Sequence, residues 1–178
     1  MTIPAQASQP WADILYESLK SAHVRQAFYV PDAGHARLIQ LLHADEALQT
    51  TVLTTEEEGI ATSAGAWLGG DRSVVLMQSS GVGNCINMLS LPSICQFPLL
   101  LIITMRGEWQ EFNPWQVPMG QATGRALDLM GVTTLRVENL QDLEEAVASA
   151  SVLAFDSGQR VAVVLAQRLL GKKKWTNE

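Results

Sequence analysis

Residues 73–84 read SVVLMQSSGVGN, an uninterrupted apolar run that passes directly into a polar turn with two glycines. A second such run, LLLII, occupies residues 99–103. Strands that are apolar at every position are typical of a parallel sheet covered by helices on both faces, because both sides of each strand are buried. The two runs therefore predict two central strands of such a sheet.

The rest of the chain repeats this alternation of short aliphatic or β-branched runs with longer segments of helical periodicity. The pattern predicts an α/β domain of three layers, with a mostly parallel six-stranded sheet between helices on both faces. The strands are expected to centre on residues 26–30, 51–54, 73–77, 99–104, 134–137 and 161–165. Helices are expected near residues 10–21, 33–43, 56–68, 82–91, 118–130 and 140–156.

The composition predicts one ordinary globular domain over residues 1–178. Hydrophobic residues make up 47% and charged residues 17% of the chain, and 12 Lys and Arg against 18 Asp and Glu give a net charge of −6. This charge argues against nucleic acid or an anionic membrane surface as the main partner, because either would need clustered cations. The only basic run, at residues 172–174, is expected to be a solvated tail within about 171–178.

The cysteines and the first residues favour a cytoplasmic protein. Cys85 and Cys95 lack the spacing of a metal site and are expected to be reduced core residues. No charged segment followed by an apolar stretch opens the chain, and the longest apolar run, residues 97–103, is too short to cross a bilayer. No spacing of His, Asp or Glu predicts a zinc or magnesium site.

Residues 54–59, TTEEEG, come where a strand should pass into a helix. One interpretation is local: Thr caps the helix, and glutamates favour the positive end of its dipole. Counting forward from Glu57 in steps of three and four reaches residues 60, 61, 64 and 68, so Glu57 is expected to begin the apolar stripe and to point inward. A carboxyl group in a desolvated site has a raised proton affinity, which makes Glu57 a candidate acid or base.

Two further polar turns follow expected strands. Gln78, Ser79 and Asn84 belong to the glycine-containing turn, which either packs a helix tightly on the sheet or faces a ligand. Asp32 and His35 belong to residues 30–35, VPDAGH, where each could cap a helix or contact a substrate. Because the carboxyl ends of parallel strands lie at one edge of a sheet, these turns are expected to converge on a single site.

A long loop, residues 106–118, interrupts the alternation and carries two tryptophans and two prolines. Loops of this length in a compact domain are usually functional or form an interface. Arg106 directly follows the second apolar run, and its guanidinium suits a substrate oxyanion. The alternative is an interface arginine that pairs with Glu108 or Glu111 or stacks on Trp109.

In this arrangement the chain resembles the pyrimidine-binding domain of thiamine-diphosphate-dependent 2-oxo acid decarboxylases. It is most similar to the branch that acts on sulfopyruvate and phosphonopyruvate, and within it to the short, separately encoded alpha subunits. The resemblance covers about residues 29–132. Its most specific segments are YVPD at 29–32, EEEGIA at 56–61 with AGAWLG at 64–69, MQSSGVGN at 77–84, RGEW at 106–109 and NPWQ at 113–116.

The resemblance implies a role for each candidate residue. Glu57 matches the glutamate that hydrogen-bonds the ring nitrogen N1′ of the cofactor's aminopyrimidine and promotes its activation. Gln78, Ser79 and Asn84 are expected to position the cofactor. Asp32, His35 and Arg106 are expected to contact the substrate. His35 is also expected to act as the proton shuttle.

The family's diphosphate motif, Gly-Asp-Gly followed by Asn-Asn, does not occur in this sequence. The resemblance therefore implies a separate beta subunit that binds the diphosphate and Mg²⁺, and a hetero-oligomer with the active site between the chains. The expected reaction converts sulfopyruvate to sulfoacetaldehyde and CO2, or alternatively phosphonopyruvate to phosphonoacetaldehyde and CO2. The alternative of another class is a nucleotide-binding module or a non-catalytic regulatory subunit. A dinucleotide-binding motif would read GxGxxG, but Gly81 and Gly83 are followed by Ile86 in place of the third glycine, which argues against the nucleotide-binding module.

Overall fold

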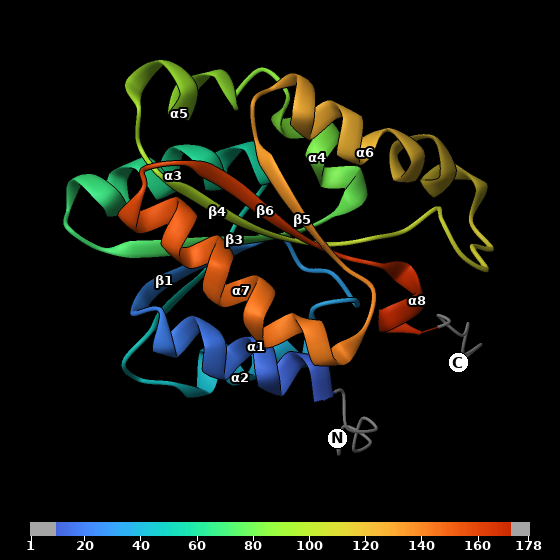
Figure 1. Ribbon diagram of the computed structural model, residues 1–178, viewed down its shortest axis with the longest axis horizontal. Coiled ribbons are helices and arrows are strands. Elements are labelled where there is room, and N and C mark those ends of the chain that lie inside the picture. Colours follow the sequence, from blue (N-terminus) through green and yellow to red (C-terminus); the bar gives the residue numbers. More distant parts are fainter. Residues whose placement is uncertain (1–9, 172–178) are drawn as a thin grey trace.

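The computed structural model describes residues 10–171, which form one six-stranded parallel sheet with helices on both faces (Figure 1). The strand order is β2-β1-β3-β4-β6-β5, so the two uninterrupted apolar runs are indeed central. The predicted strands and the three-layer α/β class are confirmed. The strands are β1 Val24–Tyr29, β2 Gln49–Val52, β3 Arg72–Gln78, β4 Leu99–Thr104, β5 Thr133–Val137 and β6 Arg160–Leu165.

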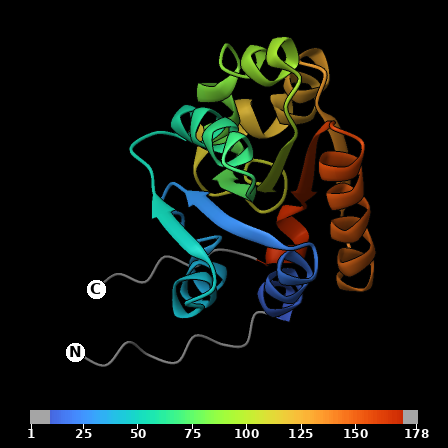
Figure 2. The same ribbon diagram turned by 90° about the vertical axis from the view of Figure 1, so that its left-hand side faces the viewer.

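Successive residues of the central strands point to opposite faces and build two separate cores. Val74 and Leu76 of β3 pack with α1, α2 and α7, whereas Val75 and Met77 pack with helices of the other face. Figure 2 shows α1, α2 and α7 on one side of the sheet and α3 to α6 on the other. The helices are α1 Pro10–Ser21, α2 Ala36–Ala44, α3 Glu56–Leu68, α4 Ser79–Cys85, α5 Ser90–Cys95, α6 Val117–Leu129, α7 Leu143–Ser151 and α8 Gln167–Leu170.

Some helix predictions need correction. The single helix expected at residues 82–91 is two short helices, α4 and α5. Pro92 explains the interruption. In the interior of a helix the proline ring clashes with the carbonyl four residues earlier, and proline has no N–H to donate to it, whereas proline is tolerated in the first turn of a helix. The helix expected at 140–156 is divided into a 3-10 turn Leu140–Asp142, α7 and a π-helical turn Val152–Asp156.

Cys85 is buried, as expected, but Cys95 is exposed at the end of α5, so its prediction as a core residue is wrong. The expected tail at residues 172–174 lies outside the described residues. No helix within residues 10–171 is long and apolar enough to cross a membrane.

Since all strands are parallel, every strand ends at the same edge of the sheet, and the loops of the candidate residues start there. At this edge the long loop leaves β4 under the start of α6. A Cβ atom at Gly120 would lie 2.1 Å from the carbonyl oxygen of Arg106, and Gly107 has a φ of +77°. Two glycines thus permit the close approach of α6 to the loop that follows β4.

Candidate active site

A cavity of about 170 Å³ opens at the carboxyl edge of the sheet. The side chain of Asp32 from the loop after β1 and that of Gln78 from the end of β3 meet there, with 2.9 Å between Gln78 Nε2 and Asp32 Oδ1. The structure thus brings together two of the turns that the sequence placed at one edge. The residues that line this cavity are Trp11, Asp32, Ala33, Gly34, Gln78, Thr104, Met105, Arg106, Gln167, Leu170 and Gly171.

Asp32 is nearly buried and is held by internal donors. Besides Gln78, the hydroxyl of Thr104 donates to its Oδ2 at 2.9 Å, and His35 Nδ1 lies 3.6 Å from the same oxygen. Burial alone would raise the pKa of Asp32, but the adjacent His35 ring, the Gly34 backbone and Thr104 outweigh it and hold the pKa well below its usual range. Asp32 therefore brings a negative charge to the cavity wall.

His35 is fully buried at the N-terminus of α2 and does not line the cavity. Its ring stands edge-on to that of Trp11, with 6.4 Å between the ring centroids. Neither ring nitrogen has a hydrogen-bond partner within residues 10–171. Asp32 and Trp11, which both contact His35, line the cavity in its place, so the ring of His35 does not reach that cavity directly. Its role as proton shuttle stays a prediction.

The prediction that Glu57 points inward is wrong, since its side chain is exposed. The buried side of α3 is formed by Gly59, Ile60, Ser63 and Ala66. Counting back from Gly59 and Ile60 in steps of three and four reaches Glu56 twice and Glu57 only once, and Glu56 is accordingly the less exposed of the two. The sequence count was off by one position because alanines on both sides of the helix left the stripe ambiguous.

The structure separates the three glutamates by their partners. Glu56 accepts a hydrogen bond from Asn84 Nδ2 at 2.7 Å, and Glu58 accepts one from the backbone nitrogen of Thr54 at 2.9 Å. Glu57 has no hydrogen bond or ion pair with any residue of the described part. It is therefore the one carboxylate of the three that is available to a ligand.

Two observations place the start of α3 against α4. Burial raises the pKa of the Cys85 thiol to about 12, and the negative charges of Glu56 and Glu57 add to this effect. A Cβ atom at Gly81 would lie 2.5 Å from Cγ of Glu56, so only glycine fits beside this side chain. Glu57, however, is not among the residues that line the cavity, and neither is Asn84. Ser79 does not line this cavity either, so a single site that includes Glu57, Ser79 and Asn84 stays a prediction.

Ser79 and Arg106 also have internal partners. The buried hydroxyl of Ser79 accepts a hydrogen bond from the backbone nitrogen of Arg106 at 3.1 Å, which ties α4 to the loop after β4. The Arg106 guanidinium forms a two-pronged pair with Glu111, with 2.6 Å between Nε and Oε2. The weighed alternative of an ion pair within the loop is thus observed. Roles of Ser79 in cofactor binding and of Arg106 in substrate binding stay predictions.

Gln167, the first residue of α8, lines the same cavity and was missed by the sequence analysis. No motif surrounds it. Its one available signal was its place directly after a buried strand, at the edge where the other candidates lie.

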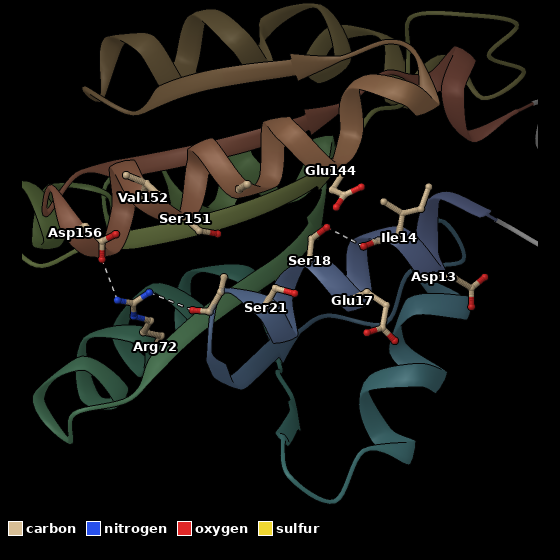
Figure 3. A pocket seen from close by; sticks show the side chains of 12 residues that line it. Asp13, Ile14, Glu17, Ser18, Ser21, Arg72, Glu144, Ser151, Val152 and Asp156 are labelled. Atoms are coloured by element: carbon tan, nitrogen blue, oxygen red, sulfur yellow. Dashed lines mark hydrogen bonds and ion pairs between the residues drawn. The ribbon is translucent and has the colours of Figure 1, made fainter.

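A larger cavity, of about 620 Å³, lies elsewhere, in a groove between α1 and α7 (Figure 3). Acidic side chains such as Glu17 and Glu144 line this groove, and the hydroxyl of Ser18 donates a hydrogen bond to the carbonyl oxygen of Ile14. It contains none of the residues predicted from the sequence. Within residues 10–171, no three His, Cys, Asp or Glu side chains gather as they would around a metal ion.

Comparison with known proteins gives a consistent family. Residues 10–120 match the family described as thiamine pyrophosphate enzyme, N-terminal TPP binding domain. The chain is 32% identical to sulfopyruvate decarboxylase subunit alpha of Methanothermobacter thermautotrophicus, over 86% of this chain and 94% of that protein. The protein of the same name from Methanocaldococcus jannaschii is 33% identical over 84% of this chain and 89% of its own length.

Other similarities cover less of the related protein. Phosphonopyruvate decarboxylase of Streptomyces viridochromogenes is 38% identical over 56% of this chain and 26% of its own length. A structure of 2-oxoglutarate:ferredoxin oxidoreductase from Magnetococcus marinus superposes with a TM-score of 0.76 over 90% of this chain and 29% of that chain. Its sequence identity of 16% limits this likeness to the fold.

Proposed function

The chain belongs to the thiamine pyrophosphate enzymes, and we propose that it is the pyrimidine-binding alpha subunit of a two-subunit 2-oxo acid decarboxylase, with residues 1–178 acting as one domain. The preferred substrate is sulfopyruvate, which yields sulfoacetaldehyde and CO2. The match to sulfopyruvate decarboxylase alpha subunits over 94% and 89% of their lengths supports this choice. Phosphonopyruvate is the second candidate, favoured by 38% identity to a phosphonopyruvate decarboxylase over a shorter segment.

The free carboxylate of Glu57 is the observation that carries the proposal. The chemistry of this donor fits the cofactor's aminopyrimidine, because a carboxyl group can both hold a ring nitrogen and pass a proton to it. Glu56 and Glu58 are each tied within the chain through one oxygen, to Asn84 and to the backbone nitrogen of Thr54, whereas Glu57 has no such bond. When bound, thiamine diphosphate supplies the electron sink for the loss of CO2. Glu57 has the task of holding and moving the proton at N1′.

The exposure of Glu57 supports the proposal of a partner chain. The exposed carboxylate is in contact with water, whereas a covering subunit would exclude water from the site. The absence of the diphosphate motif from the sequence and the word alpha in the names of the relatives support a separate beta subunit. We place the diphosphate and Mg²⁺ mainly on that subunit, and the hetero-oligomer in the cytoplasm.

The cavity beside Asp32 is proposed as the substrate side of the site. Asp32 is held ionised, so it repels the anionic groups of a substrate and restricts where they can lie. Arg106 shares this wall and keeps its Nη1 donors, since Glu111 takes up Nε and Nη2. A sulfonate or phosphonate can accept hydrogen bonds from Nη1. Gln78 orients Asp32, while Ser79 and Asn84 support the cofactor side by holding the loop after β4 and Glu56.

The decisive experiment uses the purified chain together with its co-purifying partner. Calorimetry measures thiamine diphosphate binding in the presence of Mg²⁺, and an assay follows CO2 release from sulfopyruvate, phosphonopyruvate and pyruvate. We expect binding and turnover of the wild-type pair, loss of turnover in Glu57→Ala, and near-normal turnover in Glu58→Gln. Equal behaviour of Glu57→Ala and wild type would favour a regulatory subunit. Failure of the wild-type pair to bind the cofactor would overturn the proposal.

A further inference from the structure

Much of the loop after β4 is exposed to solvent. Phe112 is 41% and Trp115 is 82% exposed, and the only regular structure before α6 is the 3-10 turn Pro114–Gln116. Nevertheless the loop follows a defined path across the cavity wall. Hydrogen bonds hold its backbone in place, and two side chains accept most of them.

Gln167 is the first of these side chains. It is 4% exposed, and its Oε1 accepts hydrogen bonds from the backbone nitrogens of Glu108 and Trp109, both at 2.9 Å. Its Nε2 donates to Glu111 Oε2 at 2.9 Å. An amide is the neutral side chain that can accept at one end and donate at the other. Gln167 thus fastens both the start and the middle of the loop to the end of β6.

Glu111 is the second. Besides Gln167, it accepts hydrogen bonds from Arg106 Nε at 2.6 Å, from the backbone nitrogen of Gly107 at 3.1 Å and from that of Asn113 at 3.0 Å. Its side chain is 4% exposed, and that of Arg106 is 11% exposed. The position of the guanidinium is therefore set by Glu111, and the position of Glu111 is set in part by Gln167.

We propose that Gln167 is a positioning residue for substrate recognition: through Glu111 it fixes the direction in which the remaining Nη1 donors of Arg106 meet the anionic head of the substrate. This assignment rests on the proposed function, because it needs a substrate with a sulfonate or phosphonate group. It concerns a residue that touches neither the reacting carbonyl nor Glu57. Its loss should therefore change KM for the anionic acids more than kcat.

The substitution Gln167→Glu separates positioning from simple support of the loop. The introduced carboxyl group keeps the oxygen that accepts hydrogen bonds from the backbone nitrogens of Glu108 and Trp109. When protonated it also replaces the donor to Glu111, so at low pH the variant should resemble the wild type. When ionised it faces the Glu111 carboxylate and repels it.

The charges around position 167 determine the direction of this titration. Glu111 and Glu108, whose Oε2 lies 3.3 Å from the backbone nitrogen of Gln167, both disfavour ionisation, and Asp32 on the same cavity wall adds to them. Of the nearby cations, Arg106 is paired with Glu111 and Arg136 with Glu108, and Arg168 of the same helix is exposed to solvent. Burial acts in the same direction as the carboxylates. The introduced group should therefore have a raised pKa, and its effect should grow as the pH rises.

The experiment compares the wild type, Gln167→Glu and the exposed-site control Gln141→Glu, each in complex with the partner subunit. For Gln167→Glu we expect KM for sulfopyruvate to rise roughly ten- to hundredfold with increasing pH, the range for one charge-assisted hydrogen bond. We expect no comparable rise for pyruvate or for the control. A pH-independent KM, or equal losses for both substrates, would overturn the assignment.

A second measurement needs no catalysis. Hydrogen exchange in the isolated chain reports the protection of the Glu108 and Trp109 amides. We expect lower protection in Gln167→Leu, which has no acceptor, and a pH-dependent loss in Gln167→Glu. Unchanged protection in Gln167→Leu would overturn the assignment even if the enzyme is active. A wild-type complex that decarboxylates neither acid would instead overturn the proposed function.

Discussion

Replacing Glu111 by glutamine should lower the free energy of unfolding by about 3 kcal/mol at neutral pH. The hydrogen bond from Arg106 is the main reason why the pKa of Glu111 lies at about 2 instead of its ordinary 4.5; the backbone nitrogens of Asn113 and Gly107 and the Gln167 amide also lower it, against the opposing effect of burial. A difference of this size corresponds to about 3 kcal/mol of preference for the ionised form in the folded state. Glutamine cannot carry this charge and leaves the nearly buried Arg106 without its counter-ion.

The pH dependence follows from the direction of the shift. Because the folded-state pKa of Glu111 is depressed, its contribution is fully present above pH 4.5 and is lost as the pH falls towards 2. About half of it should remain at pH 3. The difference between wild type and Glu111→Gln should therefore shrink on acidification, while both proteins also lose stability from other carboxylates.

Urea unfolding followed by circular dichroism at pH 7, 5, 4 and 3 measures this difference. The exposed Glu46→Gln is a matched control, for which we expect a change of less than about 0.5 kcal/mol at every pH. A difference for Glu111→Gln below about 1 kcal/mol at pH 7 would refute the reasoning. So would a large difference that stays constant between pH 7 and pH 3, because it would then arise from packing and not from the charge.

Further predictions concern the two sides of the site. Glu57→Gln should keep the fold but slow cofactor activation by orders of magnitude, measured as C2 proton exchange by NMR, whereas Glu58→Gln should be mild. Gly81→Ala should displace Glu56 and lower stability by roughly 1–3 kcal/mol, measured by thermal unfolding. Arg106→Ala should raise KM for the sulfonated or phosphonated acid about ten- to hundredfold, in steady-state assays, with little effect on pyruvate. The isolated chain should fold but show no decarboxylase activity and no Mg²⁺-dependent affinity for thiamine diphosphate in calorimetry.

The sheet could be predicted from the sequence because its signal is local. The apolar runs of β3 and β4 are continuous, so a short stretch of sequence is enough to identify them as central strands. The turns of Gly, Pro or polar residues between the apolar runs indicate how many strands there are. The meeting of Asp32 and Gln78 was predictable for the same reason, because parallel topology brings the ends of neighbouring strands to one edge.

The side chains of the site were harder, for two physical reasons. On a helix a shift of one position turns a side chain by about 100°, so Ala61 and Ala64 beside Ile60 were enough to put Glu57 in place of Glu56 on the buried stripe. Gln167 was missed because its partners Glu108 and Glu111 are 59 and 56 positions away, and no local pattern marks such a contact. For Arg106 the sequence allowed two kinds of partner, a carboxylate of the same loop or an anionic group of a substrate. Only the folded chain shows that Glu111 is within reach.

The charges of the cavity wall indicate how the two subunits divide substrate recognition. Asp32 is held ionised, and the positive charge of Arg106 is compensated by Glu111, so these three groups together contribute one net negative charge. A substrate with a carboxylate and a sulfonate, next to a diphosphate, needs positive charge that this wall does not provide. What the wall does provide is direction, through donors of Arg106 that Glu111 and Gln167 hold in place. We therefore propose that the attraction comes from the partner subunit and the Mg²⁺ assigned to it under the proposed function, whereas this chain sets where the anionic head can lie.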